Sequence, residues 1–371
     1  MMAIRVLHVA EAAGGVERYL NSLLKYSSNE DVENILICSQ NYDATQFKRY
    51  CRTVIQLNMA HDIEFSSDIK NIKAIKKAIK QYQPDIAYAH STKAGALTRL
   101  ACIGKNLPVI YNPHGWAFNM QQSKLKSNIY KLIEKVQSPF TKKIICISEA
   151  EKISALKNKI CSADKIQVIT NGIDLEQLDS IPSFSREDLN IPKGAFVVGQ
   201  VGRLSKQKAP DVFVNMSAII KRRIPNSFFI MVGNGDEEKQ IRNQIKSLGL
   251  EDSFLLTGWV NNPTAYLSCM DVATLLSRWE GFGLVLAEYM YSGVPLVATN
   301  VDAIPYVVDD GTDGLLVNPD APEDAAQAVI KLHKNKDLAQ RLIENGLATV
   351  KENYDIQRVV QQTNDLYKEI L

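Results

Sequence analysis

The sequence has few cysteines and no long apolar run, and both shortages limit what the protein can be. Its 371 residues include six cysteines, none in a CxxC pair, which argues against a disulfide framework. The five histidines show no metal-ligand spacing. No run of about 18 apolar residues occurs, so we expect no transmembrane helix. The short apolar start lacks the features of a signal peptide, so we expect a cytoplasmic chain with reduced thiols.

An excess of charge of one sign is also missing. Lysine and arginine number 43 against 41 acidic residues, a net charge of +2, so the overall balance gives no reason to expect a nucleic-acid partner. The length is large for one domain and suits two, at roughly 100–200 residues per domain. Each half is long enough to bury a core of its own.

The sequence does contain a regular alternation of short β-branched runs and amphipathic segments. We predict strands at 4–9, 35–38, 54–57, 86–89, 109–112, 144–147, 167–169, 196–202, 228–232, 254–257, 272–276 and 296–298. Helices are predicted at 17–26, 69–82, 93–104, 124–138, 148–158, 210–222, 236–248, 263–269, 284–292, 322–333, 336–350 and 355–370. This alternation predicts an α/β protein with two parallel sheets, each covered by helices on both faces.

A turn signal at 171–174 separates the two halves. It leads into the polar stretch 179–194, which is broken by Pro182 and Pro192 and which we predict to be a linker. The predicted domains are 1–175 and 176–354. Ligands of open α/β sheets bind at the carboxyl ends of strands, so the loops after the strands are the places to look for chemistry.

The most informative motif, EGFGLVLAE, runs from Glu280 to Glu288. Its glycines open a loop and its second half starts a helix, which places free backbone N–H groups of Gly283, Leu284 and Val285 where a phosphate would bind. Each carboxylate can accept two hydrogen bonds, as ribose or sugar hydroxyls would supply. Taken alone, a glycine-kinked loop with two ordinary glutamates explains the motif about as well.

A basic loop, GRLSKQK, follows the first strand of the second half. Arg203 and Lys208 lie five positions apart in it, so both can reach one anion. The planar fork of arginine and the point charge of lysine suit a diphosphate. A solvated basic loop is the alternative.

Other loops at strand ends carry glycine, histidine or an aromatic residue. Paired glycines let the backbone approach a ligand, a histidine can donate or accept a hydrogen bond, and the remaining loops could flank a nucleotide base. Each alone is explained as well by a plain turn or by packing, but their shared placement favours a ligand site. The residues are Gly14, Gly15, His114, Gly233, Asn234, Trp259 and Val260.

These motifs resemble those of the family 4 retaining glycosyltransferases, which have the GT-B fold. The resemblance covers most of the chain and is densest over 196–319. The family's E-x7-E motif matches Glu280 and Glu288, and its GRL-x-x-QK element matches 202–208. The resemblance implies two Rossmann-like domains facing an interdomain cleft, with the final helix, 355–371, packing back on the first domain.

The resemblance also implies roles for the candidate residues. The donor would be a nucleotide sugar, most often a UDP- or GDP-sugar, and no further cofactor or metal is expected. Arg203 and Lys208 would hold the donor diphosphate, Glu288 the ribose, and Glu280 the transferred sugar. Gly14 and Gly15 would approach the donor from the first domain. The catalytic candidates are His114, Arg203, Lys208 and Glu280.

The chain departs from the family pattern in two places. Ala209, and the pair Asp302 and Ala303, stand where relatives usually have glycine, and Tyr306 stands where they usually have glutamate. The change at Ala209 is small. The changes at 302–306 alter a loop beside the donor and leave the donor's identity open.

The stretches HSTKAG and PHGWAF resemble bacterial enzymes that build capsule, exopolysaccharide or lipopolysaccharide units on lipid-diphosphate-linked saccharides. The pattern over 69–82 is basic and amphipathic, and 120–165 is rich in lysine. Such segments can bind anionic lipid, although an ordinary surface helix explains 69–82 slightly better. We expect a saccharide acceptor and peripheral contact with the inner face of the cytoplasmic membrane.

Three other functions share part of this pattern. A nucleotide-sugar epimerase has a similar architecture but lacks the combination of E-x7-E with the basic loop. A non-catalytic partner subunit would have degenerate motifs, whereas the four charged residues are present here. A carbohydrate-binding module would not need a phosphate site.

Overall fold

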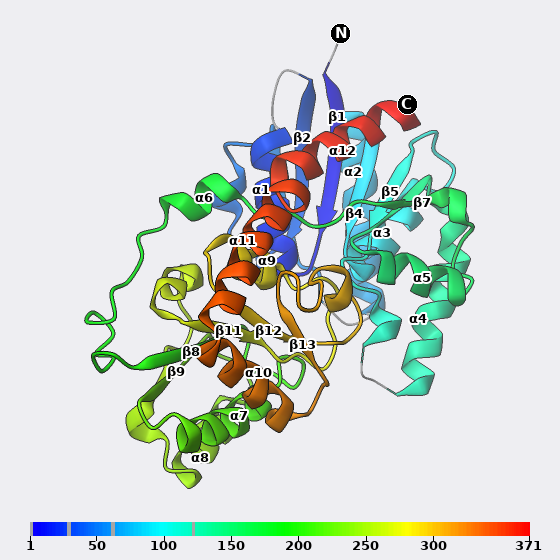
Figure 1. The fold of residues 1–371 in the computed structure, drawn as a ribbon. Coiled ribbons are helices and arrows are strands. Elements are labelled where there is room, and N and C mark those ends of the chain that lie inside the picture. Colours follow the sequence, from blue (N-terminus) through cyan, green and yellow to red (C-terminus); the bar gives the residue numbers. More distant parts are fainter. Residues whose placement is uncertain (1–2, 28–30, 61–63, 121–122) are drawn as a thin grey trace. The chain divides into compact units, whose positions relative to one another are not determined.

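The computed structural model describes residues 3–27, 31–60, 64–120 and 123–371. The chain forms two compact units (Figure 1). Unit 1 comprises Met1–Ile173 and Ile356–Leu371, and unit 2 comprises Asp174–Asp355. The described part of the chain contains no helix that is both long and apolar enough to cross a membrane.

Unit 1 is built on one sheet of parallel strands in the order β3-β2-β1-β4-β5-β6-β7. The strands are β1 (Ile4–Ala10), β2 (Val32–Ser39), β3 (Thr53–Leu57), β4 (Ile86–His90), β5 (Val109–Asn112), β6 (Lys143–Cys146) and β7 (Ile166–Val168). The helices are α1 (Gly15–Ser27), α2 (Phe65–Tyr82), α3 (Thr92–Cys102), α4 (Lys124–Gln137), α5 (Glu149–Lys157) and α12 (Ile356–Ile370). The strands and helices predicted for this part of the chain are confirmed, with ends that shift by a few residues.

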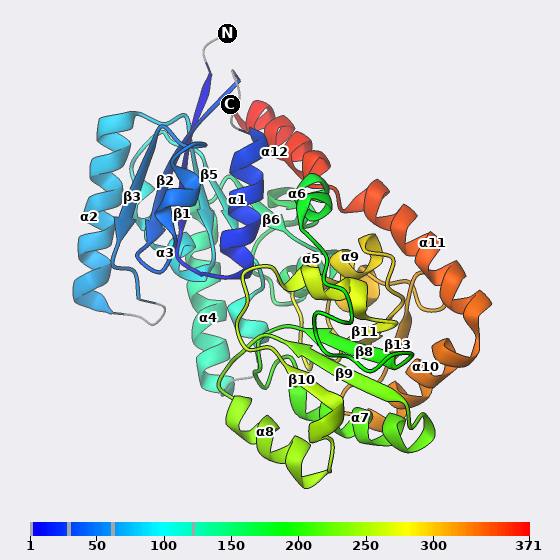
Figure 2. The same ribbon diagram turned by 90° about the vertical axis from the view of Figure 1, so that its left-hand side faces the viewer.

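Helices cover both faces of this sheet, because alternate residues of each strand point to opposite sides. Figure 2 shows α2 on one side of β1, β2 and β3, and α1 with α12 on the other. On β1, Val6 and Ala10 join the core beneath α1 and α12, whereas Leu7 and Val9 join the core beneath α2 and α3. His8 therefore lies on the face covered by α1 and α12.

Unit 2 repeats the arrangement with the strand order β10-β9-β8-β11-β12-β13. Its strands are β8 (Phe196–Val201), β9 (Ser227–Val232), β10 (Phe254–Leu256), β11 (Val272–Leu275), β12 (Leu296–Thr299) and β13 (Leu315–Val317). Its helices are α6 (Leu175–Ser180), α7 (Pro210–Arg223), α8 (Glu238–Ser247), α9 (Leu284–Tyr291), α10 (Pro322–Lys334) and α11 (Lys336–Asn353). The fold of both units is the predicted doubly wound α/β type.

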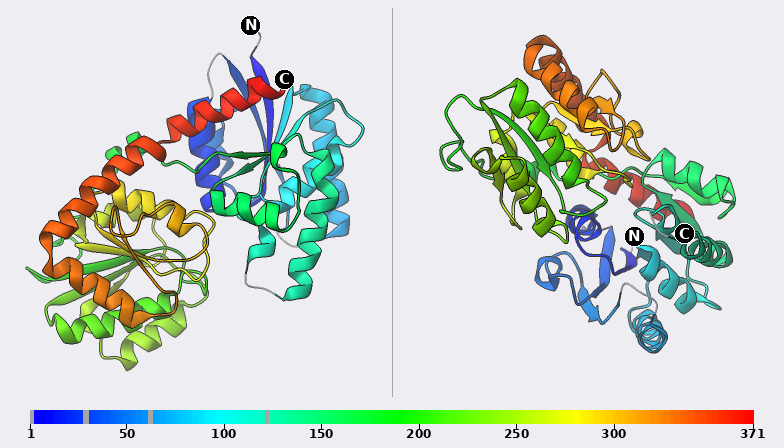
Figure 3. Two further views of the ribbon diagram at one scale, coloured as in Figure 1. Left: turned by 45° about the vertical axis from the view of Figure 1, so that its right-hand side comes forward. Right: turned by 90° about the horizontal axis from the view of Figure 1, so that it is seen from below.

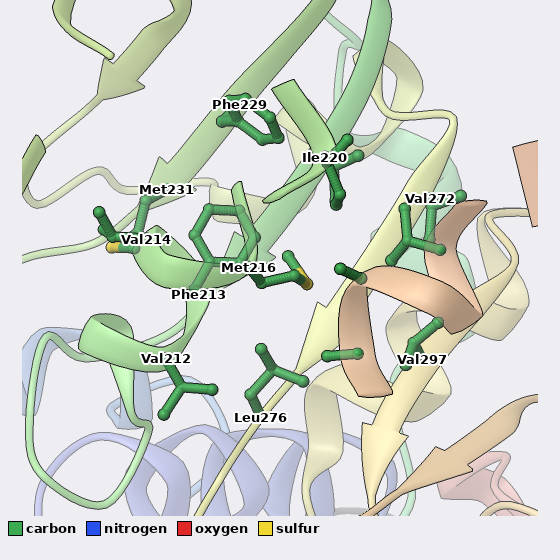
Figure 4. Packing of buried hydrophobic residues seen from close by; sticks show 14 of the residues in the cluster. Val212, Phe213, Val214, Met216, Ile220, Phe229, Met231, Val272, Leu276 and Val297 are labelled. Carbon is green, nitrogen blue, oxygen red and sulfur yellow. The ribbon is translucent and has the colours of Figure 1, made fainter. Parts of the chain in front are cut away.

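The core of unit 2 lies between its sheet and the helices α7 and α10, which Figure 3 shows in green and orange. Phe213, Met216 and Ile220 of α7 point toward Phe229 on β9 and Val272 on β11 (Figure 4). These side chains are at most 1% exposed. The core fixes the strands whose carboxyl ends carry the candidate site.

Two predictions about this half need correction. The stretch 179–194 is not a free linker, because Arg186 fastens it to unit 2 through an ion pair with Asp271 at 3.0 Å and a hydrogen bond to the Cys269 carbonyl at 3.1 Å. Composition could not show this, since both partners lie more than 80 positions away in sequence. The predicted helix 263–269 is a 3-10 helix, Pro263–Cys269.

Candidate functional site

The candidate site of unit 2 lies where the sheet changes its winding direction. β8 and β11 are neighbours, but the chain continues from β8 to β9 and from β11 to β12, on opposite sides. Doubly wound sheets bind ligands at this point. The Tyr289 hydroxyl holds the two strand ends together, because it accepts from Val201 N at 2.8 Å and donates to Thr274 O at 3.2 Å.

Arg278 ties together the loops that follow these two strands. Its guanidinium donates to both carboxylate oxygens of Asp211, at 3.1 and 2.7 Å, and to the Lys206 carbonyl at 2.9 Å. It also donates to Asp320 Oδ1 at 2.7 Å. Arg278 N donates to the Gln207 carbonyl at 2.8 Å. Charge-assisted hydrogen bonds of this kind hold the loops in one arrangement.

Lys208 and Glu280 meet within this frame. Lys208 Nζ donates to Glu280 Oε2, and Ser277 Oγ donates to the same oxygen at 3.3 Å. The two charged side chains are 18% and 10% exposed. Glu280 N donates to Asp302 Oδ2 at 3.1 Å. The structure thus brings together two residues of separate sequence motifs.

Helix α9 starts at Leu284, four positions after Glu280. Gly283 is its N-cap with φ +81°, and a Cβ there would lie 3.0 Å from Leu286 Cδ1, so the position requires glycine. The N–H groups of Leu284 and Val285 have no acceptor within the helix and carry partial positive charge. They can bind an anion. Glu288 lies further along α9 and is 1% exposed.

The other candidates of unit 2 lie on neighbouring loops. Arg203 is exposed, and its loop packs so closely on Gly233 that a Cβ there would come within 2.2 Å of the Gly202 carbonyl. Asn234 O accepts from Leu204 N at 2.8 Å. An isolated bridge joins Gly233 to Gly258, so these loops form one row. Beyond Gly258 come Trp259, which is 69% exposed, and Val260, which is half-buried.

Two of the divergent positions have a backbone conformation that favours glycine. Ala209 has φ +48° and Asp302 has φ +44°, a region that glycine occupies at the lowest cost. Asp302 brings something that glycine lacks, namely the carboxylate that accepts from Glu280 N. Burial, together with the nearby Glu280 carboxylate, raises the pKa of Asp302.

The candidates of unit 1 lie together at the carboxyl ends of its strands. Gly14, with φ +81°, and Gly15 are exposed at the start of α1. Tyr19, one turn later, packs edge-on against His114 with ring centroids 4.8 Å apart. His114 N donates to Asn112 Oδ1 at 2.9 Å. Burial lowers the pKa of His114 to about 3, so its imidazole is neutral at physiological pH.

Of the two lysine-rich segments, α2 exposes the apolar residues Phe65 and Ile69 in its first turns, whereas α4 exposes apolar side chains along its whole length. In α2 the residues Ile75 and Ile79 are buried against the sheet, as in an ordinary surface helix. In α4 four apolar side chains with helical spacing are exposed. Leu125, Ile129, Leu132 and Val136 are 73%, 45%, 61% and 61% exposed.

Sequence reasoning missed Arg278, Asp211, Ser277 and Tyr289. Arg278, Asp211 and Tyr289 act through partners far away in the sequence, such as the 67 positions that separate Arg278 from Asp211. Ser277 acts through Glu280, three positions further on. The one available signal is the pair of basic and acidic residues in SRWEGFG, directly after a buried strand. Within the described ranges, no group of three or more His, Cys, Asp or Glu residues is arranged to hold a metal ion.

Comparison with known proteins gives two matches to family models. The model of Glycosyltransferase Family 4 matches residues 13–177, and that of Glycosyl transferases group 1 matches residues 183–349. Together the two matches cover most of the chain.

Several similar proteins have names that refer to bacterial polysaccharide synthesis. The chain is 28% identical to the UDP-Gal:alpha-D-GlcNAc-diphosphoundecaprenol alpha-1,3-galactosyltransferase of Escherichia coli, over 98% of this chain and 96% of that protein. It is 30% identical to an uncharacterised 41.2 kDa protein in the cps region of Klebsiella pneumoniae, over 85% and 86% of the two chains. Capsular polysaccharide biosynthesis glycosyltransferase CapM of Staphylococcus aureus is 25% identical over 89% and 88%.

Solved structures share the fold. HepE of Anabaena, crystallised with UDP, superimposes with a TM-score of 0.82 at 21% identity, over 99% of this chain and 100% of that one. The sucrose-phosphate synthase of Thermosynechococcus elongatus gives a TM-score of 0.86 at 21% identity, over 99% of both chains.

Proposed function

Because the chain belongs to the glycosyltransferases that these two family models describe, we propose that it is a retaining hexosyltransferase of bacterial surface polysaccharide synthesis. It takes a sugar from a nucleotide-sugar donor and attaches it to a saccharide on a lipid diphosphate. The main support is the meeting of Lys208 and Glu280 beside the start of α9. The relative from Escherichia coli, whose name states a UDP-sugar donor and a lipid-diphosphate acceptor, matches nearly the whole chain.

The site supplies the charges that such a reaction needs. When the bond between the anomeric carbon and the donor oxygen breaks, negative charge develops on the leaving diphosphate. Arg203, Lys208 and the N–H groups at the start of α9 stabilise that charge without a metal ion. The acceptor oxygen bonds to the anomeric carbon on the face that the diphosphate leaves, and the acceptor's proton passes to a phosphate oxygen. Glu280 and Glu288 bind hydroxyls of the sugar and of the ribose.

A transfer assay tests this proposal. Purified protein is mixed with UDP-galactose, UDP-glucose, UDP-N-acetylglucosamine or GDP-mannose, and with N-acetylglucosamine on a diphosphate lipid, with and without EDTA. We expect transfer from one donor, unaffected by EDTA, to a product whose NMR coupling constant shows the donor's anomeric configuration. An inverted product would contradict the retaining mechanism, and loss of activity in EDTA would contradict metal independence. Free epimerised nucleotide sugar would indicate the epimerase instead.

We further propose that α4 (Lys124–Gln137) attaches the protein to anionic lipid. Its exposed apolar stripe, Leu125, Ile129, Leu132 and Val136, is flanked by lysines, the combination that anionic bilayers bind. The orientation of the helix is fixed from the opposite side, where Glu134 accepts from buried Arg99 at 2.9 Å and from the Tyr111 hydroxyl at 2.8 Å. The flanking lysines are Lys124, Lys126, Lys131 and Lys135.

Vesicle sedimentation tests this attachment. We expect binding to phosphatidylglycerol-containing vesicles and weak binding to phosphatidylcholine alone. Leu132→Glu should weaken binding at least about tenfold, since it removes the apolar burial of one leucine and adds a negative charge. Ile69→Glu, a control on exposed α2, should bind like wild type. Equal binding by Leu132→Glu and wild type would overturn the assignment to α4.

A further inference from the structure

Three histidines of unit 1 form a continuous hydrogen-bonded row beneath α1 and α12. His8 Nδ1 lies 3.1 Å from His90 Nε2, and His90 Nδ1 lies 3.1 Å from His114 Nε2. His8 and His90 are completely buried on adjacent strands, and His114 follows the next strand of the sheet. The row leads from the interior of the unit to its candidate site residue.

The inner end of the row sets the direction in which its hydrogen bonds are donated. Asn34 Nδ2 donates to Ser27 Oγ at 3.2 Å, so its oxygen faces His8 Nε2, also at 3.2 Å. An amide oxygen only accepts, so the proton of neutral His8 is on Nε2 and its Nδ1 is an acceptor. His90 must then donate from Nε2, and by the same logic His114 donates from Nε2 to His90 Nδ1. The lone pair of His114 Nδ1 is left for another partner.

The row is held in its neutral form. Burial lowers the pKa of His8 to about 4 and that of His114 to about 3, and the pKa of His90 is well below its usual range because of burial and its two histidine neighbours. Tyr19 and Tyr88 pack on the row and Tyr367 packs on Tyr88. Burial raises the pKa of each of these tyrosines, which come from three different elements, so they too are uncharged at neutral pH.

We propose that Asn34, His8 and His90 are positioning residues that fix His114 with its proton on Nε2, so that His114 Nδ1 accepts a hydrogen bond from a saccharide hydroxyl. The inference rests on the proposed transferase function. A neutral imidazole nitrogen with a free lone pair attracts a hydroxyl proton and repels the oxygens of a phosphate. The row therefore assigns His114 to a sugar and leaves the diphosphate to other groups.

Nitrogen NMR tests the proton positions without any substrate. The full chain is labelled with 15N-histidine, and a long-range proton–nitrogen correlation at pH 7.5 distinguishes protonated from unprotonated ring nitrogens. Assignments come from His8→Gln, His90→Gln and His114→Gln spectra. We expect His8, His90 and His114 to carry the proton on Nε2. A His114 proton on Nδ1, or a mixture of both forms, would overturn the proposal even if the protein is a transferase.

A second experiment breaks the row at its inner end. In Asn34→Leu the anchor for His8 is lost, so we expect His114 to show both tautomers and kcat/KM for the saccharide substrates to fall about 3- to 10-fold, the value of one hydrogen bond. Binding of free UDP should not change. Thr363→Val is the control. Thr363 lies on α12 outside the row and is as buried as Asn34, and the substitution removes its hydrogen-bonded hydroxyl.

The two experiments separate the possible failures. If Asn34→Leu and Thr363→Val give the same kinetics and the same His114 spectrum, the row is only a buried structural network. If the wild-type tautomers are as expected but no donor or acceptor supports transfer, the proposed function fails and the positioning of His114 stands. Should Asn34→Leu fail to fold, the wild-type spectrum alone decides the tautomer.

Discussion

At the scale of single residues, Lys208 and Glu280 are ion-pair partners in the candidate site. In the proposed function, the diphosphate of a donor competes with Glu280 for Lys208, and the released carboxylate is then available to sugar hydroxyls. The same contact that organises the site would thus weaken its affinity for the nucleotide. Substitution of Glu280 should therefore affect nucleotide binding and sugar transfer in different ways.

Glu280→Gln should have opposite effects on the two steps. We expect the Kd for the nucleoside diphosphate to fall about fivefold, because a partly buried ion pair worth about 1 kcal/mol no longer competes. We expect kcat to fall about 10- to 100-fold, because a charged hydrogen bond to the sugar is lost. Calorimetry and a transfer assay measure the two values. Asp236→Asn, an equal charge change on an exposed neighbouring loop, is the control; weaker nucleotide binding by Glu280→Gln would contradict this account.

Glu151 predicts a pH dependence of stability. It lies in the first turn of α5, accepts from Ile147 N at 2.9 Å, and burial raises its pKa from 4.5 to about 8. A carboxyl group with a raised pKa in the folded state stabilises below pH 4.5, and that stabilisation is lost as the pH rises to 8.

The free energy of unfolding of Glu151→Gln, relative to wild type, should therefore increase between pH 5 and 8.5, by up to about 4 kcal/mol. Urea titrations at several pH values measure it. Glu149→Gln, on the exposed side of the same helix, should show no such trend. Parallel pH curves for Glu151→Gln and wild type would show that Glu151 ionises normally.

The sequence allowed Arg203, Lys208, Glu280 and the glycines of their loops to be named, because these residues fall into short motifs. It could not reveal that Lys208 contacts Glu280, since 72 positions separate them. The histidine row was missed for the same reason, since 82 positions separate His8 from its partner His90. Contacts between residues that are far apart in the sequence leave no local sequence pattern.

At the scale of elements, the strand-end loops of unit 2 act as one assembly because Arg278 joins them. The positions of the strands could be predicted, because each strand is a short β-branched run whose residues are buried alternately or continuously. The loops between them have no period, and their arrangement depends on single side chains. The correction of the 179–194 stretch has the same origin, since Arg186 is one residue in a segment that looks like a linker.

Arg278→Lys tests this assembly. Lysine keeps the charge but not the planar fork, so at least two charge-assisted hydrogen bonds are lost. We expect the free energy of unfolding of unit 2 to fall by about 1–2 kcal/mol, and nucleotide binding to weaken. Arg242→Lys, in an exposed pair with Glu238, should change stability by less than about 0.5 kcal/mol. Equal stabilities of the two variants would mean that Arg278 does not hold the loops.

At the scale of the whole molecule, the chain passes between its units twice. It leaves unit 1 after Ile173 and returns at Ile356, where Ile356 N donates to the Ile173 carbonyl at 3.0 Å. The returning helix α12 buries Val359, Leu366 and Tyr367 in unit 1. The last 16 residues are thus part of the first unit's core, and unit 2 is the continuous insertion that carries the basic loop.

In the proposed function, unit 2 binds the diphosphate of a nucleotide sugar through Arg203. Isothermal titration of the full chain with UDP, GDP, ADP and dTDP tests it most directly, with Arg203→Ala and, as a control, the exposed Arg222→Ala. We expect one of these nucleotides to bind wild type and Arg222→Ala alike, and Arg203→Ala to bind it at least about tenfold more weakly. Binding by none of the four to folded protein, or equal binding by Arg203→Ala, would contradict the account.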